Sequence, residues 1–245
     1  MRHLLVINPN TGQATTQRLS SHLQTLLPKD VALDCITARF GAPYIACEAS
    51  HAVASHALLD AWAHHLHAAD HSPDAVVIAC FGDPGLFALR EASAAPVTGL
   101  AEASFIQASR LGPFAIVTGG IRWKPMLERL ALGLGFASQL QHIELVLETG
   151  AQLLADRELA LRVLAQACNQ AAQTGVKSVI LGGAGLAGYA ADLQASVDVP
   201  LIDSVSAGVD LYLQRALPPS LRDFNGFETT WTQMPAQMDF GLLDR

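Results

Sequence analysis

The two halves of this sequence can be aligned with each other, and that internal repeat limits the folds open to the chain. DAVVIACFGDPG at 74–85 aligns with KSVILGGAGLAG at 177–188, an offset of 103 residues. Downstream, APVTGLAEA at 95–103 aligns with VPLIDSVSA at 199–207, an offset of 104. Each segment is typical of a short apolar strand followed by a turn and a helix. We therefore expect two similar units.

Apolar strand-like and amphipathic helix-like segments alternate along both halves, which predicts parallel sheets. In the first half the expected strands are 3–8, 31–37, 75–80 and 96–99, and the expected helices 13–27, 47–70, 84–93 and 101–110. In the second half the strands are 114–118, 139–146, 177–182 and 199–203, and the helices 122–135, 156–173, 185–195 and 204–215.

This order of elements predicts an α/β fold with two pseudo-symmetric lobes, each a small parallel sheet flanked by helices. We expect one lobe to comprise residues 1–98 plus 204–225, the other 99–203, and a C-terminal tail to comprise 226–245. Ligands of such folds bind outside the carboxyl ends of the strands, so the active site is expected in the cleft between the lobes.

Composition and charge narrow the possible partners. The 245 residues carry a net charge of −7 and no run of Lys and Arg, which argues against nucleic acid and anionic membrane surfaces. The first apolar stretch, Leu4 to Ile7, is too short for a signal peptide, and no later stretch reaches transmembrane length. We expect a cytoplasmic protein that binds a small molecule and, given its apolar composition and aromatic tail, forms a homo-oligomer.

Cys80 is the candidate catalytic residue. It ends the apolar run Ala75 to Ala79, directly before a turn rich in Gly and Pro, and therefore stands at the ligand-binding end of a buried strand. We expect backbone N–H groups of the following turn and helix to lower its pKa, because such groups stabilise a thiolate. Cys35 and Cys168 are expected to pack as small apolar residues, and Cys47 to stand at a helix start.

Substrate contacts are expected from the other strand ends, where backbone N–H groups can stabilise charge on a substrate oxygen. Asn8 and Thr118 occupy equivalent strand ends in the two halves, with helix capping as the alternative role, and Glu102 is a candidate polar edge. The remaining candidates belong to turns that follow strands: Phe81, Gly82, Gly119, Gly120, Gly183, Ala184 and Gly185.

Two further patterns are better explained without a cofactor or a metal. Gly183, Gly185 and Gly188 fit GxGxxG, and Asp203 follows Gly183 by 20 residues, but only 42 residues remain after Asp203 (245 − 203). A loop that approaches a small anion is favoured over a dinucleotide site.

His67 and His71 have the i, i+4 spacing of a metal pair, yet no acidic or Cys partner at ligand spacing completes a site, so a solvated helix face is expected.

Four motifs together resemble the aspartate/glutamate/hydantoin racemase superfamily, above all its hydantoin and allantoin racemase branch. They are INPNT at 7–11, ACFGDPGL at 79–86, GLAEAS at 99–104 and LGGAGLAG at 181–188, and the resemblance runs from residue 3 to residue 215. It implies a cofactor-free enzyme in which two Cys residues face opposite sides of a carbon next to a carbonyl. Cys80 matches the first of them, whereas the position of the second holds Gly183.

Three hypotheses follow. The first is a racemase or epimerase of an amino-acid derivative, either a carboxylate or a cyclic ureide such as a hydantoin, with Cys80 on one face and water or Tyr189 on the other. The second is a decarboxylase similar to arylmalonate decarboxylases, whose single Cys lies in the second lobe, so that a product of opposite hand is expected here. The third is a small-anion binding protein in which Cys80 is only packed.

Overall fold

Two four-stranded parallel sheets form the centre of the molecule, and their matching order confirms the expected α/β fold. The computed structural model describes residues 1–148 and 150–220. The first sheet has the order β2 (Val31–Thr37), β1 (Arg2–Asn8), β3 (Ala75–Ile78), β4 (Val97–Gly99). The second has the order β6 (Leu140–Val146), β5 (Phe114–Gly119), β7 (Ser178–Gly182), β8 (Leu201–Asp203).

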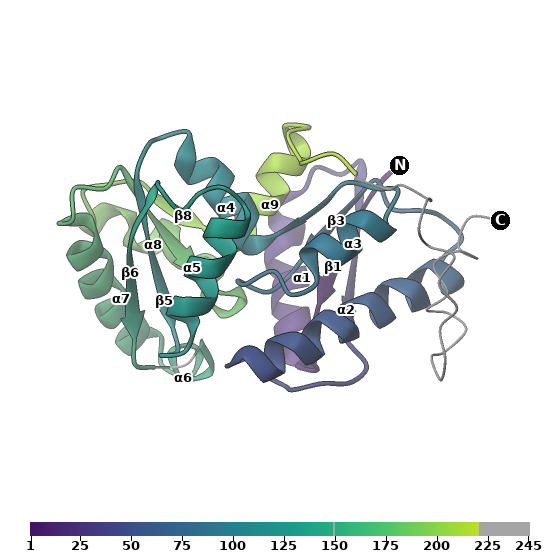
Figure 1. Cartoon of the computed structure of the whole chain (residues 1–245), viewed down its shortest axis with the longest axis horizontal. Helices are drawn as coiled ribbons and strands as arrows, with labels where there is room; N and C mark the ends of the chain where they lie inside the picture. The colour runs from purple at the N-terminus through teal and green to yellow at the C-terminus, as the bar shows by residue number, and fades with distance from the viewer. Residues whose placement is uncertain (149, 221–245) are drawn as a thin grey trace.

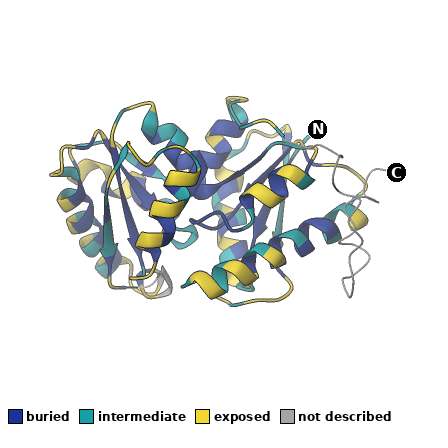
Figure 2. Cartoon of the chain, viewed as in Figure 1, coloured by how far each residue is buried: buried dark blue, intermediate teal, exposed yellow. Residues whose placement is uncertain are grey.

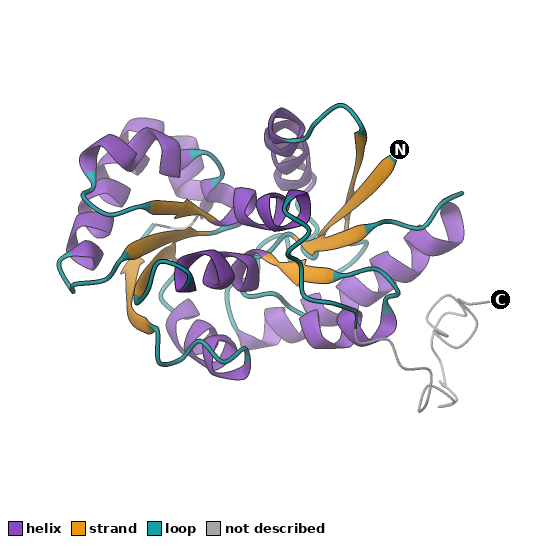
Figure 3. Cartoon of the chain, turned by 90° about the horizontal axis from the view of Figure 1, so that it is seen from above, coloured by secondary structure: helices purple, strands orange, loops and turns teal. Residues whose placement is uncertain are grey.

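Helices flank both sheets (Figures 1 and 3). The first half contains α1 (Gln13–Leu26), α2 (Glu48–Ala68), α3 (Leu86–Ala92) and α4 (Leu100–Ser109). The second half contains α5 (Trp123–Gly133), α6 (Gly150–Ala155), α7 (Arg157–Ala172), α8 (Tyr189–Leu193) and α9 (Ser204–Leu213), with the 3-10 turns η1 (Ala184–Leu186) and η2 (Gln194–Ser196).

The second half departs from the sequence prediction at two places. The helix α6 was not predicted, and the single helix expected over 185–195 is divided into η1, α8 and η2. The break after η1 has a local cause, because Ala187 has a non-helical ψ of 127° and Gly188 has a φ of +83°, a left-handed conformation that glycine adopts without strain.

Apolar residues on both faces of the central strands explain why both sheets are covered by helices. Along β1, Leu4 and Val6 join the apolar cluster that contains Leu19 of α1, whereas Leu5 and Ile7 join the cluster of α2. Side chains alternate between the two faces of a strand, so such a run requires helices on each side. The central strands β3, β5 and β7 are accordingly buried along their whole length, whereas the edge strands β2 and β6 are mostly half-buried (Figure 2).

Two helices cross between the sheets. The helix α4 follows β4 of the first sheet, but its Phe105 stacks on Phe114 of β5 in the second sheet, with ring centroids 5.5 Å apart. The helix α9 follows β8 of the second sheet, but Gly208 lies against β3 of the first, where a Cβ would stand 3.1 Å from the Val77 side chain. The crossing helices contact each other between the sheets (Figure 1).

The lobe boundaries 1–98 plus 204–225 and 99–203 stay a proposal. Residues 221–225 and the predicted tail 226–245 lie outside the described residues. Within residues 1–148 and 150–220, no helix has both the length and the apolar character that a membrane span requires.

Candidate active site

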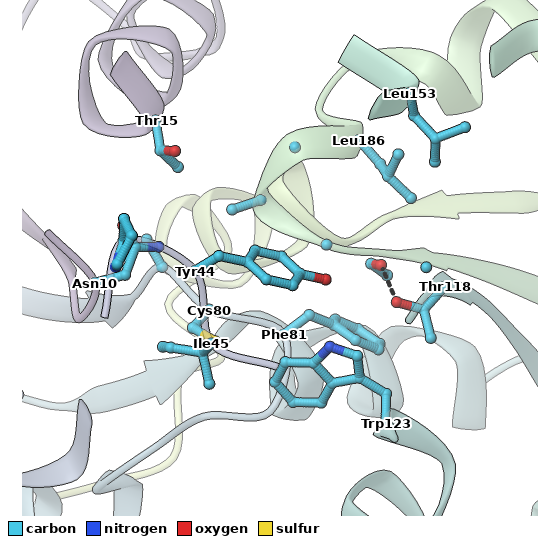
Figure 4. Close-up of a pocket in the computed structure, with 17 residues that line it drawn as sticks. Asn10, Thr15, Tyr44, Ile45, Cys80, Phe81, Thr118, Trp123, Leu153 and Leu186 are labelled. Carbon is cyan, nitrogen blue, oxygen red and sulfur yellow. Dashed lines mark hydrogen bonds between the residues drawn. The ribbon is translucent and has the colours of Figure 1, made fainter. Parts of the chain in front are cut away.

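A pocket of about 160 Å³ lies where the carboxyl ends of the two sheets meet (Figure 4). Both halves of the chain line it. From the first half come Asn10, Thr15, Pro43, Tyr44, Ile45, Ala79, Cys80 and Phe81, and from the second Thr118, Gly119, Trp123, Leu153, Gly182, Gly183, Ala184, Gly185 and Leu186. Cys80 and Gly183, which the repeat aligns, therefore line the same pocket.

Cys80 begins a tight turn directly after β3. Its carbonyl accepts the N–H groups of Gly82 and Asp83 at 3.0 and 3.1 Å, and Asp83 adopts a left-handed conformation with a φ of +47°. These bonds satisfy the backbone of Cys80 and leave its thiol as the group that it presents to the pocket. The residue is only 7% exposed.

The expected lowering of the Cys80 pKa is wrong. Burial raises the pKa of this thiol far above its usual value, and the nearby Asp83 carboxyl raises it further. Two N–H groups that were expected to act on the sulfur, those of Gly82 and Asp83, donate to the Cys80 carbonyl instead. At neutral pH the resting group is consequently a thiol and a proton donor.

Asp83 connects the Cys80 turn to α4. Its carboxylate accepts the N–H groups of Ala101 and Glu102 at 2.9 and 2.7 Å, in the first turn of that helix. Burial raises the Asp83 pKa to about 7. A Cβ at Gly99 would lie 2.1 Å from the Asp83 side chain, so glycine is required there. The side chain of Asp83, from ACFGDPGL, thus occupies the space beside Gly99, from GLAEAS, where a side chain would otherwise lie.

Glu102 lies outside the pocket. It is buried in an ion pair with Arg90 and accepts the Thr98 hydroxyl at 2.8 Å. Arg90 also donates to the Val97 carbonyl at 2.9 Å. Through these contacts the Glu102 carboxylate connects α3, β4 and α4. Its proposed role as a polar edge of the site stays a prediction.

Asn8 also stands behind the pocket wall. Its fully buried amide donates to Asn10 Oδ1, to the Gly12 carbonyl and to Thr16 Oγ1, at 3.0 to 3.2 Å. These bonds hold the loop with Asn10 and the start of α1, whose Thr15 also belongs to the pocket lining. Within INPNT it is therefore the second asparagine that reaches the cavity.

On the opposite wall, polar atoms fix the backbone around Gly183. The Thr118 hydroxyl donates to the Gly182 carbonyl at 2.7 Å, and the Gly183 N–H donates to Ser204 Oγ at 3.1 Å. The Phe81 ring lies over Gly182, where a Cβ would come within 2.2 Å of it. The close approach of the two halves depends on the missing side chain at Gly182.

Several amides that were expected to bind substrate already have acceptors. The Gly82 N–H donates to the Cys80 carbonyl and the Gly120 N–H to the Val146 carbonyl, and neither Gly82 nor Gly120 belongs to the pocket lining. The remaining candidates that line the pocket are Phe81, Gly119, Ala184 and Gly185. The last two begin η1, where the first N–H groups have no acceptor within the turn.

Tyr44 is a pocket residue that the sequence analysis missed. It lies in the loop after β2 and lines the pocket together with Trp123; burial of its hydroxyl and the nearby Cys80 raise its pKa. Figure 4 shows its hydroxyl pointing from the first half toward Thr118. The only signal was GAPYIA after the second strand, which has no chemical motif. Tyr189 lies elsewhere, with its hydroxyl donating to the Leu153 carbonyl at 3.3 Å.

Asp203 is already used as a helix cap. Its carboxylate accepts the N–H groups of Val205 and Ser206, at 2.8 and 3.1 Å, and that of Gly188. This use leaves the acid of the GxGxxG pattern bound to the protein's own backbone. The small-anion loop stays a prediction.

The comparisons with known proteins identify the class. The sequence profile of the family described as Asp/Glu/Hydantoin racemase matches residues 4–212. A hydantoin racemase from Paenarthrobacter aurescens is 34% identical over 208 residues, which cover 83% of this chain and 86% of the relative. The chain therefore belongs to the Asp/Glu/hydantoin racemase family and is an enzyme of the isomerase class.

Solved structures support the same branch. The allantoin racemase from Klebsiella pneumoniae superposes with a TM-score of 0.84 and 26% identity, covering 99% of this chain and 100% of that one. An arylmalonate decarboxylase superposes with a TM-score of 0.59 and 17% identity, covering 89% and 96%. At that identity the decarboxylase shows the shared fold alone.

Proposed function

We propose that this enzyme exchanges a proton at a carbon next to a carbonyl or carboxylate of an amino-acid derivative, with a hydantoin-like cyclic ureide as the favoured substrate. Cys80 is the proposed acid/base, and no cofactor takes part. The observation that carries the proposal is the place of Cys80 in a pocket between the two sheets, opposite the Gly183 loop. The similarity to hydantoin and allantoin racemases supports the substrate class.

Racemisation requires the C–H bond to break on one face of the carbon and to form again on the other. The Cys80 thiolate accepts the proton from one face, and the electron pair moves onto the neighbouring carbonyl oxygen as an enolate. Because burial raises the Cys80 pKa, the thiolate is scarce at neutral pH, and the rate of proton removal is expected to rise with pH. Proton return from the thiol needs no such activation.

Charge on the enolate oxygen needs fixed hydrogen-bond donors. The amides of Ala184 and Gly185 at the start of η1 are two candidates, and the Tyr44 hydroxyl is a third, because its raised pKa keeps it protonated. Removing one such donor from an enzyme commonly costs about 3–4 kcal/mol in transition-state stabilisation.

The opposite face of the substrate is proposed to exchange its proton with water. At Gly183 a Cβ would meet only the Leu186 side chain, at 3.6 Å, so the space that a second thiol would fill is open. The hydroxyl of Tyr189 is bonded to Leu153 and is not available for this step.

Decarboxylation is the second candidate, and a single protonated thiol in a largely apolar pocket favours it. In that reaction the C–CO₂ bond breaks, its electron pair stays on the carbon, and the Cys80 thiol delivers one proton to that carbon. Solvent then returns a proton to the thiolate. Since the thiol lies in the first half, we expect a product of opposite hand to that of an enzyme whose single thiol lies in the second.

Deuterium entry tests the proposal. Each enantiomer of a 5-substituted hydantoin is incubated with the enzyme in D₂O and followed by NMR and polarimetry; wild type is expected to exchange both. Cys80→Ser is expected to lose the activity, whereas Cys47→Ser, at the N-cap of α2, is expected to keep it. Exchange that survives Cys80→Ser would contradict the assignment. Release of CO₂ from an arylmalonate without hydantoin exchange would favour the decarboxylase.

A further inference from the structure

A cluster of imidazole and carboxylate groups lies in the first sheet, toward the opposite end of β1 from the pocket. It combines His3 on β1, Asp34 on β2 and His71 in the loop between α2 and β3. One nitrogen of each histidine and one carboxylate oxygen of Asp34 all lie within 4.8 Å of one another. Nothing in the proposed reaction uses these residues.

Strand register and loop bonding bring the three together. In the β1–β2 pairing His3 is opposite Ala32 and Leu5 opposite Asp34, so His3 and Asp34 project on the same face of the sheet. The chain leaves α2 and returns across this face, and Asp74 fixes its position: Asp74 Oδ2 accepts the His3 N–H at 2.6 Å, and the Asp74 N–H donates to the His3 carbonyl at 2.8 Å.

The two imidazoles lie close to each other and to the carboxylate. The ring centroids of His3 and His71 lie 3.7 Å apart, and His71 Nε2 is 3.4 Å from Asp34 Oδ2. His3 Nδ1 is buried and has no hydrogen-bond partner among the described residues. A buried nitrogen without a partner is costly, and a cation would satisfy it.

A third imidazole borders the cluster. The Nε2 atom of His65, on α2, is likewise buried without a hydrogen-bond partner in the described part of the chain. The charges of Asp34 and His71 both reach His65. Two partnerless imidazole nitrogens therefore occur in one corner of the fold.

We propose that His3, Asp34 and His71 bind a divalent first-row transition ion of the Zn²⁺ type. Zn²⁺ takes imidazole and carboxylate ligands at about 2.0–2.2 Å, which places tetrahedral ligand atoms about 3.3 Å apart. The side chains of His71 and Asp34 are 38% and 40% exposed and can rotate to close the remaining gap. Water supplies the fourth ligand. The ion joins β1, the edge strand β2 and the α2–β3 loop, and its role is structural.

Zn²⁺ binding to the metal-free full-length protein, without a histidine tag, tests the site. Calorimetric titration is expected to give one ion per chain, and a hundredfold excess over Kd is expected to raise the Tm by about 5–10 °C. His71→Ala and the isosteric Asp34→Asn are expected to lose at least tenfold in affinity. His67→Ala, an exposed histidine outside the cluster, is the matched control and is expected to bind as wild type does.

Co²⁺ as a second probe separates this site from the thiols. The cluster predicts visible absorption without a sulfur-to-cobalt charge-transfer band in the near ultraviolet, and the spectrum is expected to disappear in His71→Ala. Equal Zn²⁺ affinity in wild type and His71→Ala would overturn the proposal, as would the absence of saturable binding to wild type. A charge-transfer band lost on Cys80→Ser would assign the ion to the pocket instead.

Discussion

Placing a thiol at Gly183 tests the inferred geometry of the pocket most directly. A Cβ there meets only Leu186, at 3.6 and 3.8 Å, which is ordinary contact, so Gly183→Cys is expected to fit. The cost comes from the backbone, because Gly183 has a φ of +146°, a conformation that residues with a side chain rarely adopt. Such strain is worth about 1–3 kcal/mol, and urea denaturation should show a loss of stability of that size.

The same substitution is expected to accelerate racemisation. A positioned acid or base typically increases the rate by a factor of about 10²–10⁴. Because the Gly183 loop is strained in this variant, we expect only part of that increase. We therefore expect at least a tenfold faster loss of optical rotation from a hydantoin enantiomer in Gly183→Cys. Gly183→Ala is the matched control, since it carries the same backbone strain without a thiol, and it is expected to be no faster than wild type.

Two outcomes would refute this reasoning. If Gly183→Cys racemises no faster than Gly183→Ala while both remain folded, position 183 does not face the reacting carbon. If the gain persists after Cys80 is replaced by Ala, the new thiol acts alone, and the opposed arrangement of the two positions is wrong. Mass spectrometry of the assayed enzyme must show that Cys80 and the thiol introduced at position 183 are both reduced, because a disulfide between them would mask the gain.

Three further predictions concern packing and protonation. Gly182→Ala would force its Cβ against the Phe81 ring, and we expect a loss of about 1–3 kcal/mol in urea denaturation together with lower exchange activity. Iodoacetamide should label Cys47, whose pKa a hydrogen bond to Ser50 lowers, at lower pH than Cys80, as peptide mapping will show. The pKa of Asp83 is about 7 in the folded protein, against an ordinary value of 3.8. Because the unfolded chain ionises first, the free energy of unfolding should fall progressively from about pH 4 to pH 7. The difference in unfolding free energy between wild type and Asp83→Asn measures this fall, and a pH-independent difference would contradict it.

The sequence was informative about elements whose signals are local. Short apolar segments followed by turns predicted each strand found in residues 1–148 and 150–220, and the offset of 103 predicted that the second sheet would repeat the first. It missed α6 and the division of 185–195, because short turns respond to packing more than to periodicity. Self-association and cellular location stay predictions.

The candidate site could be predicted only in part from sequence. Strand-end logic found Cys80, Thr118 and the Gly183 loop, because the carboxyl ends of parallel strands meet at one edge. The sequence did not predict that Asn10 would line the pocket and that Asn8 would lie behind its wall, since the hydrogen bonds of Asn8 to Gly12 and Thr16 decide this. Tyr44 and Trp123 carried no motif and entered through loops whose paths depend on distant contacts.

The sequence by itself determined the duplicated α/β architecture, the family and the position of one thiol opposite a glycine, because these follow from short-range pattern and motif. Only the tertiary structure decided the state of that thiol, since its raised pKa arises from burial by residues far away in the chain. It also brought His3, Asp34 and His71 together, which no helical spacing indicates, because strand register and a returning loop set their distances.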